Sequence, residues 1–429
     1  MRVHPSALAV LGDQLPVKLA DGREVSYVNL DYAATAPCLQ AAADAVNELL
    51  PWYASVHRGA GAASQRCTLA YEQARQNVAD FLDARPDDHV VFTRNTTDSL
   101  NLLARALPAD TTVIGWAGEH HANLLPWHRT LRLPIAQSPA EAVDSLDSAL
   151  RGRSGPMLVA VTGASNVTGE IWPLAELTEV AHRHSARILV DAAQLAPHRQ
   201  VSLQDSGIDY LALSGHKLYA PFGAGVLAGR ADWLDLAEPY LAGGGATAHV
   251  GDAIGDVRWN LGPARHEAGT PNLLGVVAVA TVCEQLSAAD RDLLAVEEQA
   301  LLDRIRAGLA ELDGVAELRS FAADHDRVGI VSFAVAGVPA SEVSAHLAIR
   351  HGIDVRDGLF CAHPLVRRLL GQAPIQLGQP LQGGAVRASI GLGSTVEHVD
   401  RLLAGLADLI EIRSGVTASS GQQPGRALS

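Results

Sequence analysis

Short apolar stretches alternate with helical segments between residues 90 and 214, and this alternation limits the chain to few folds. The apolar stretches have the length of strands and lie at Val90–Thr93, Thr112–Trp116, Pro156–Thr162, Arg187–Val190 and Tyr210–Leu213. Segments with helical periodicity fall between most of them, at 97–106, near 121–129 and at 174–184. Strands that are connected through helices form a mostly parallel sheet with helices on both faces. The sequence therefore predicts an α/β protein.

The remaining chain divides around this region. We expect an N-terminal arm at 1–25, a large domain at 26–275, a smaller C-terminal α+β domain at 276–413 and a disordered tail at 414–429. The small domain is expected to contain a long helical region near 274–312, strands at Val328–Val335, Ile353–Val355 and Ala385–Ile390, and helices at 340–351 and 396–412.

Composition excludes several classes of protein. The formal net charge of −14 argues against nucleic acid or an anionic membrane as the main partner. The four cysteines (Cys38, Cys67, Cys283 and Cys361) show no C-x-x-C spacing, so neither a disulfide framework nor a zinc site is expected. No apolar run reaches 18 residues and no secretory signal is recognisable. We expect a cytoplasmic protein without a membrane anchor.

Polar motifs follow the predicted strands, where parallel α/β sheets bind their ligands. Lys217 lies in Ser214-Gly215-His216-Lys217, directly after an apolar strand, and Asp191 ends the strand Ile188–Asp191. A partly desolvated lysine beside His216 has a lowered pKa and can form a Schiff base with an aldehyde. A buried acid can keep a pyridine nitrogen protonated. The pair predicts pyridoxal 5′-phosphate as the cofactor, with an ordinary turn and a surface lysine as the alternative.

Glycines near Lys217 also invite a nucleotide-binding interpretation. Gly223, Gly225 and Gly229 do not fit G-x-G-x-x-G, and no acidic residue follows at the required distance. We therefore disfavour a dinucleotide loop.

Arg94–Asp98 follows a strand and opens a helix, where an anion would be stabilised. A plain helix N-cap explains the motif equally well when it is taken alone. Together with Ser214 and His216, it favours a phosphate cradle.

Glu119-His120-His121 has the residue types of a metal cluster, but adjacent histidines on a helix point to different faces. We expect no metal here. An imidazole that stacks on an aromatic cofactor and takes part in proton transfer is the favoured interpretation.

Cys361 and Arg387 lie in the C-terminal region. Cys361 is in a loop with Gly358, His363 and Pro364, so it is either an accessible thiol or a small buried apolar residue. Arg387 lies within an apolar strand, where an unpaired charge is costly. Its planar guanidinium suits a substrate carboxylate, and a structural ion pair is the alternative.

The ordered motifs resemble the class V aminotransferase superfamily of fold type I, and most closely the group II SUF-type cysteine desulfurases and selenocysteine lyases. The resemblance spans roughly residues 26–412 and is carried by VHRGAG, EHHANLLPW, SNVTGE, VDAAQ, SGHKLYAPFGAG, HEAGTPN, VRDGLFCAHPL and VRASIG.

This resemblance implies roles for individual residues. Lys217 would hold pyridoxal 5′-phosphate as an aldimine, Asp191 would pair with the ring nitrogen, Gln194 would contact the ring hydroxyl and His120 would stack on the ring. Thr97, Ser214 and His216 would bind the phosphate, and Thr270 would reach it from a partner subunit, which implies a homodimer with shared active sites. Asn166 and Arg387 would hold the substrate carboxylate, with Arg356 nearby. Cys361 would take sulfur from L-cysteine as a persulfide and pass it to an acceptor protein.

Three positions depart from the family pattern. Leu359 and Phe360 precede Cys361 where a histidine is common, Gly163 stands where His-Val-Ser-Asn begins, and Gly391-Leu392-Gly393-Ser394 replaces Tyr-Asn-Thr. Glycines 163, 391 and 393 are expected to enlarge the substrate pocket. A second hypothesis is therefore a C–S lyase, or a decarboxylating or transaminating relative, that acts on a larger cysteine conjugate and does not need Cys361. A third is a catalytically silent scaffold subunit.

Overall fold

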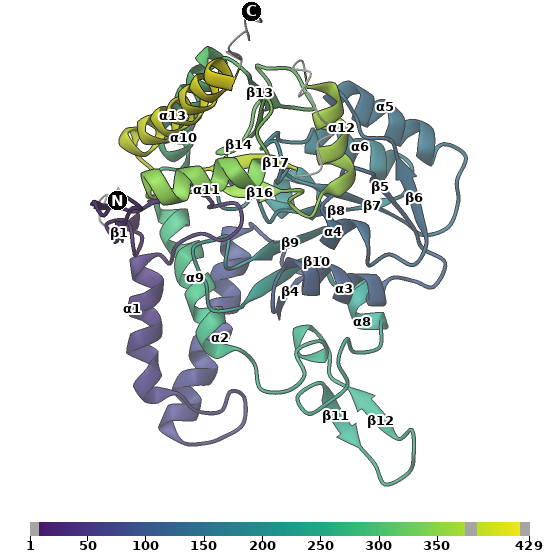
Figure 1. Ribbon diagram of the computed structural model, residues 1–429. Coiled ribbons are helices and arrows are strands. Elements are labelled where there is room, and N and C mark those ends of the chain that lie inside the picture. The colour runs from purple at the N-terminus through teal and green to yellow at the C-terminus, as the bar shows by residue number, and fades with distance from the viewer. Residues whose placement is uncertain (1–7, 374–383, 421–429) are drawn as a thin grey trace, which may run out of the picture.

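The computed structural model describes residues 8–373 and 384–420, with side chains up to residue 413 (Figure 1). Its largest element is a seven-stranded sheet in the order β4-β10-β9-β8-β7-β5-β6. The strands are β4 (Asp88–Thr93), β5 (Thr112–Trp116), β6 (Thr130–Leu133), β7 (Met157–Thr162), β8 (Arg187–Asp191), β9 (Tyr210–Ser214) and β10 (Gly225–Arg230). Strand β10 runs antiparallel to both of its neighbours, and β5 to β9 pair in parallel. The expected α/β class is confirmed.

Both faces of this sheet are buried because its strands are apolar at consecutive positions. In β8, Ile188 and Val190 join one core cluster, and Leu189 between them joins the cluster on the opposite face. This follows from the alternation of side chains along a strand. The covering helices are α1 (Gln40–Leu49), α2 (Ala62–Phe81), α3 (Thr96–Ala106), α4 (His121–Leu124), α5 (Pro139–Leu150), α6 (Leu174–Arg183), α7 (Leu203–Ser206), α8 (Ala231–Leu236) and α9 (Leu273–Ala288).

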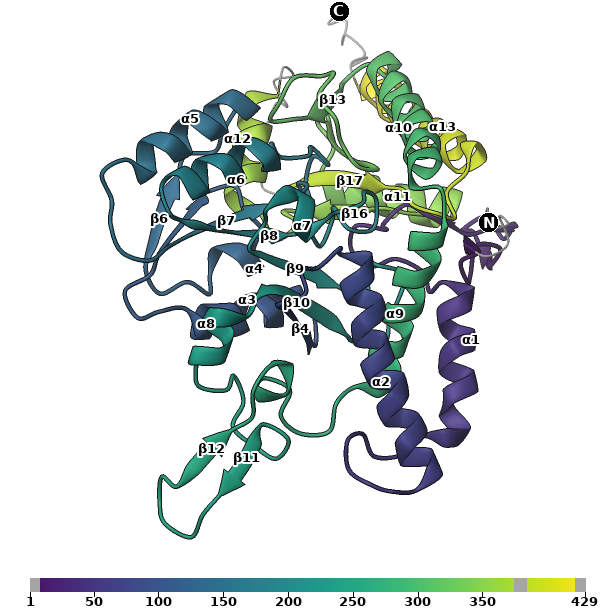
Figure 2. The same cartoon turned by 180° about the vertical axis from the view of Figure 1, so that it is seen from behind.

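A second sheet has the order β13-β14-β17-β16 and is antiparallel. It consists of β13 (Val315–Leu318), β14 (Ile330–Val335), β16 (Arg356–Gly358) and β17 (Ala385–Ser389). One face packs on α10 (Arg291–Glu311), α11 (Ala340–His351) and α13 (Val396–Ser420), and the other on α12 (His363–Gln372). The expected smaller α+β unit is therefore present, as seen from both sides in Figures 1 and 2.

The N-terminal segment packs with this second unit. Strand β3 (Val28–Asn29) pairs in parallel with β15 (Ile353–Asp354), and Val28 and Leu30 are buried in the core of the second sheet. These residues fall within the range expected from the sequence for the large domain (26–275). Pairing with a distant strand brings them to the other unit.

Several elements differ from expectation. The helical region near 274–312 is two helices, α9 and α10, bent by 92° at their junction. The helix expected near 121–129 is limited to α4. Helix α13 extends to Ser420, into the range expected as a disordered tail, and residues 421–429 lie outside the described part.

Two short hairpins complete the described chain, β1 (Pro16–Lys18) with β2 (Glu24–Ser26) and β11 (Thr247–Val250) with β12 (Val257–Trp259). The β11–β12 hairpin projects away from both sheets in Figures 1 and 2. Short 3₁₀ turns lie at Leu50–Trp52 and Pro263–Arg265. Among the described helices, none alone is both long and apolar enough to cross a membrane; only the bent pair of α9 and α10 meets that criterion together.

Glycines let β10 lie against its neighbours. A Cβ on Gly225 would be 2.5 Å from the Asn95 Cα, where α3 begins. A Cβ on Gly229 would be 2.1 Å from the Asp209 carbonyl oxygen, and Gly229 has a φ of 143°. These two residues explain the glycine-rich sequence after Lys217 as close backbone packing.

We predict that Gly229→Ala lowers the free energy of unfolding by about 3 kcal/mol, because the added methyl group meets backbone that cannot easily move. Chemical denaturation measures the change. Gly155→Ala is the matched control, since Gly155 also has a positive φ (89°) but no atom lies within 4 Å of its Cβ. Equal losses in the two variants would show that the close approach at Gly229 is unimportant.

Candidate active site

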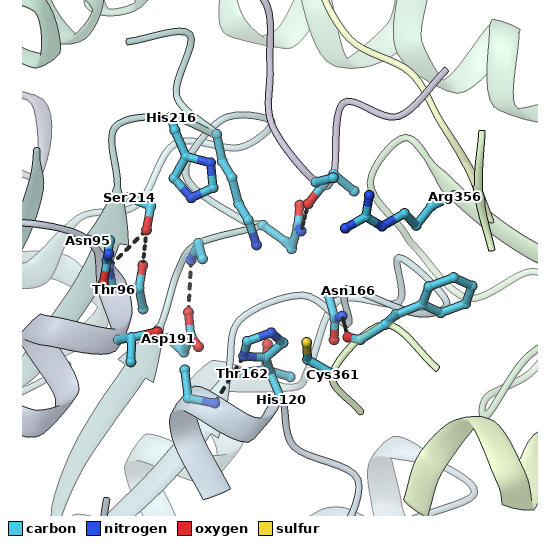
Figure 3. Close-up of a pocket in the computed structure, with 18 of the residues that line it drawn as sticks. Asn95, Thr96, His120, Thr162, Asn166, Asp191, Ser214, His216, Arg356 and Cys361 are labelled. Carbon is cyan, nitrogen blue, oxygen red and sulfur yellow. Dashed lines mark hydrogen bonds between the residues drawn. The ribbon is translucent and has the colours of Figure 1, made fainter. Parts of the chain in front are cut away.

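A cavity of about 270 Å³ lies at the carboxyl ends of the central parallel strands. Thr162, Asp191 and Ser214, which end β7, β8 and β9, all line it. Figure 3 shows these side chains around one open space. The structure brings together nearly all the residues expected in the site, namely Thr97, His120, Asn166, Asp191, Gln194, Ser214, His216, Lys217, Arg356, Cys361 and Arg387.

Lys217 and Asp191 are the central charged pair. Burial lowers the pKa of Lys217 to about 8, although Asp191 opposes the shift. Burial also raises the pKa of Asp191, against the effects of the Ala193 N–H and of Lys217. The Asp191 Oδ1 accepts a 3.0 Å hydrogen bond from the Ala193 N–H, and its other oxygen has no hydrogen-bond partner among the described residues. The pair thus supplies an amine that deprotonates easily and a carboxylate oxygen free to bind a cationic ring nitrogen.

The N-terminus of α3 lies at the same cavity. Asn95 caps the helix by accepting a 3.0 Å hydrogen bond from the Asp98 N–H. The Ser214 hydroxyl oxygen accepts a 2.8 Å hydrogen bond from the Thr96 N–H, which ties β9 to the helix. Thr97 and His216 line the cavity beside them. Helix N–H groups and hydroxyls in this arrangement stabilise a phosphate.

His120 is an uncharged aromatic side chain in the cavity. Its Nδ1 accepts a 3.1 Å hydrogen bond from the Ala122 N–H, and burial lowers its pKa to about 3. A neutral ring can stack on an aromatic group without the cost of a buried charge. Gln194 is also fixed, since its Nε2 donates a 2.8 Å hydrogen bond to the Ala33 carbonyl.

Sequence reasoning gave Glu119 no role of its own. This carboxyl group is 2% exposed and accepts hydrogen bonds from Asn123 Nδ2 (2.9 Å) and from the Thr162 N–H (3.1 Å). Burial raises its pKa to about 8. The contacts join the segment before His120 to the end of β7. The signal in the sequence that could have pointed to Glu119 was an acidic residue close to the end of a predicted strand.

Arg387 and Asn166 form a polar corner of the same cavity. The Arg387 NH2 group lies 3.0 Å from the Asp31 Oδ1, and its NH1 group donates to the Asn166 carbonyl at 3.0 Å. Arg356 NH1 lies 3.7 Å from the other Asp31 oxygen. Asp31 was missed as a site residue, although a buried arginine in a strand requires a carboxylate partner. The structural ion pair expected as the alternative for Arg387 is therefore present, through its NH2 group.

Cys361 is exposed and lies in a fixed loop. Its carbonyl accepts a 2.7 Å hydrogen bond from the His121 N–H, and the preceding carbonyl, of Phe360, accepts one from Asn166 Nδ2. His121 also makes an edge contact with His363. The second histidine of the EHH motif thus supports the cysteine loop.

The expectation that glycines enlarge the pocket is wrong. A Cβ on Gly163 would lie 2.8 Å from Leu195, and one on Gly391 would lie 2.3 Å from Tyr32. One on Gly393 would meet the Tyr32 hydroxyl at 2.7 Å. Neighbouring side chains already fill the space beside these glycines, and none of the three glycines lines the cavity. Sequence alone shows the missing side chain and not the residue that replaces it.

Thr270 lies in a different cavity of about 740 Å³, together with His57 and Arg58 of the VHRGAG motif. This second cavity does not include Lys217. Arg75 and Glu267 form an ion pair in its wall at 2.8 Å. The two motifs VHRGAG and HEAGTPN therefore meet each other but do not meet Lys217 within one chain.

Within the described ranges, one group of side chains has the spacing of metal ligands: His346, His351 and Asp408, between α11 and α13. It lies outside the cavity, and the Arg350 Nε is 3.7 Å from the same Asp408 oxygen. The EHH motif forms no such group.

The cavity fits pyridoxal 5′-phosphate. An amine of lowered pKa, a carboxylate with a free oxygen, a neutral imidazole and a helix N-terminus converge on it, and each matches one part of that molecule.

The chain belongs to the class V aminotransferase family, whose model matches residues 28–402. Enzymes of this family use pyridoxal 5′-phosphate. Among known proteins, it is 36% identical over 405 residues to a cysteine desulfurase of Dickeya dadantii, with 90% of this chain and 92% of the relative covered.

Solved structures support the same assignment to the family. The cysteine desulfurase CsdA of Escherichia coli is 33% identical with a TM-score of 0.78, and a cysteine desulfurase of Thermococcus onnurineus NA1 is 32% identical with a TM-score of 0.79. Each alignment covers 90% of this chain and 95% of the solved one. The resemblance seen in the sequence is confirmed.

We predict that Lys217 titrates near pH 8 in the cofactor-free protein. Because burial favours the neutral amine, the reactivity of the Lys217 amine toward an acetylating reagent should be half-maximal at that pH. Competitive acetylation read by peptide mass spectrometry measures this. Lys18, exposed and the only other lysine in the sequence, is the internal reference. A Lys217 profile that coincides with that of Lys18 would contradict the assigned environment.

Proposed function

We propose that this protein is a pyridoxal 5′-phosphate-dependent cysteine desulfurase that takes sulfur from L-cysteine. The observation that carries the proposal is one cavity lined by Lys217, Asp191, Arg387 and an exposed Cys361. The amine, the acid, the carboxylate anchor and the thiol are the groups that this chemistry requires. Cysteine desulfurases at 36% identity support the assignment.

The bound cofactor supplies an electron sink for the electrons of the substrate α-C–H bond. Lys217 then acts as the base at the substrate α-carbon, since its lowered pKa makes the neutral amine available near pH 8. Asp191 would hold positive charge at the ring nitrogen of the cofactor, and neutral His120 would stack on the ring. Ser214, His216 and Thr97 would bind the phosphate, and Gln194 would bind the ring hydroxyl.

Arg387 and Asn166 hold the substrate carboxylate, with Arg356 beside them. The Cys361 thiolate attacks the substrate sulfur. A sulfur–sulfur bond forms, the substrate Cβ–S bond breaks, and the electron pair left at Cβ takes up a proton. Cys361 is oxidised to a persulfide, and the substrate carbon skeleton is reduced to alanine.

Because Cys361 is exposed, its persulfide is open to a sulfur acceptor protein. The thiol must stay reduced between turnovers, so we place the enzyme in a reducing compartment such as the cytoplasm.

A larger cysteine conjugate as substrate is less well supported. The glycines that suggested extra space at positions 163, 391 and 393 are packed against Leu195, Tyr32 and Val10. Retention of the buried Arg387 and of Lys217 argues against a silent scaffold.

The proposal includes a homodimer with shared sites. Thr270 lines a cavity that does not include Lys217, which supports a contact with the phosphate of another subunit rather than with that of its own. The projecting hairpin and the loop after it expose Val250, Ile254 and Leu261 by 62%, 108% and 81%. A second copy would cover these apolar side chains.

We predict that L-cysteine yields alanine and a Cys361 persulfide in a single turnover. Lys217→Ala should lower the rate at least about 100-fold, because the base at the α-carbon is lost. Cys361→Ala should form neither product, whereas Cys38→Ala, outside the cavity, should retain both. Alanine is measured by chromatography and the persulfide by mass spectrometry. If Cys361→Ala turns over L-cysteine like the wild type, the thiol is not the acceptor and the assignment to this reaction fails.

For the dimer, we predict a solution mass of twice the 45.0 kDa chain. Thr270→Ala should weaken binding of pyridoxal 5′-phosphate about fivefold, the effect of one lost hydrogen bond, without changing that mass. Light scattering and a cofactor titration measure the two quantities. A monomer with full cofactor affinity would contradict shared sites.

A further inference from the structure

The loop that carries Cys361 occupies both groups proposed to hold the substrate carboxylate. Asn166 Nδ2 donates a 2.7 Å hydrogen bond to the Phe360 carbonyl. The guanidinium carbon of Arg387 lies 5.0 Å from the centre of the Phe360 ring, which is within cation–π distance. Figure 3 shows Asn166 and Cys361 on the same side of the cavity. A carboxylate that takes the Asn166 Nδ2 donor therefore displaces the Phe360 carbonyl, and one that binds Arg387 weakens the attraction of its guanidinium for the Phe360 ring.

Arg387 retains a donor for an incoming carboxylate. Its NH1 and NH2 groups bind the Asn166 carbonyl and Asp31, but its Nε is buried without a hydrogen-bond partner among the described residues. The whole residue is only 3% exposed. An unsatisfied N–H on a buried cation is costly, so the site is incomplete until an acceptor arrives.

The loop conformation is itself strained. Phe360 and Cys361 have φ angles of 49° and 53°, a left-handed conformation that few residues other than glycine adopt. The contacts from Asn166, Arg387 and the His121 N–H hold the two residues there. If the first two contacts are lost, the strain favours departure of the loop.

We propose that Phe360 is a specificity-determining gate that the substrate carboxylate opens. The carboxylate takes Asn166 and Arg387 away from Phe360, and this exchange releases the loop so that Cys361 can approach the substrate sulfur. The gate rests on the proposed function, since it acts on the carboxylate site and the thiol of that reaction. It makes a free α-carboxylate a condition for sulfur transfer. Compounds that lack one would leave Cys361 held in its loop.

The test measures alkylation of Cys361 by iodoacetamide in the cofactor-loaded protein, followed on the Cys361 peptide by mass spectrometry. The probes are L-alanine, which has the carboxylate but no sulfur, and L-alaninamide, in which a neutral carboxamide replaces the carboxylate. L-alanine should accelerate alkylation about 5- to 30-fold, the range expected for loss of one cation–π contact and one hydrogen bond. L-alaninamide should leave the rate unchanged.

Two variants separate the contribution of the Phe360 ring from that of the Phe360 backbone carbonyl. Phe360→Ala removes the contact with Arg387, so alkylation should be fast without L-alanine and should respond to it weakly. Phe360→Tyr keeps an aromatic ring over Arg387 and should behave like the wild type. Thermal melting of each variant checks that it is folded.

The gate is overturned if L-alanine fails to accelerate alkylation, if L-alaninamide acts equally, or if Phe360→Ala behaves like the wild type. These readouts need no desulfuration. Alanine formation from L-cysteine without any carboxylate effect on alkylation would disprove the gate and leave the proposed function standing. If L-alanine accelerates alkylation but L-cysteine is not turned over, the gate is supported and the proposed function is disproved.

Discussion

The parallel pairing of β7, β8 and β9 places the ends of three strands at one edge of a sheet whose faces are both buried. Apolar side chains fill both faces, so polar groups of these strands gather where the strands end. Thr162, Asp191 and Ser214 are therefore neighbours although they are distant in sequence. The closing face of the cavity comes from the second sheet, through Arg387 in β17 and Arg356 in β16. The site thus depends on how the two units pack.

Burial is the common cause of the unusual ionisation in this cavity. It lowers the pKa of Lys217 and His120 and raises that of Asp191 and Glu119. In each case the low-dielectric surroundings disfavour the charged form. The same desolvation makes Arg387 depend on Asp31. The cavity therefore holds an amine that deprotonates easily together with a buried guanidinium.

Much of the fold followed from local pattern. The strands of the central sheet, the lysine turn and the acid at the end of β8 were recognisable, because apolar runs and strand-end polar residues are local features. Gly163, Gly391 and Gly393 were misread, because the space beside a glycine is set by residues such as Tyr32 that come from elsewhere in the chain. Asp31 was missed for the same reason, since its partner Arg387 is far away in sequence.

The sequence by itself determined the α/β class, the family and the residue types available for the chemistry, because these depend on periodicity and on motif order. Tertiary structure decided which of these residues meet. It separated Thr270 from Lys217 and placed Phe360 over Arg387. It also packed Val28 into the second unit. The physical reason is that such contacts are set by strand pairing and side-chain packing between distant segments, which no local pattern encodes.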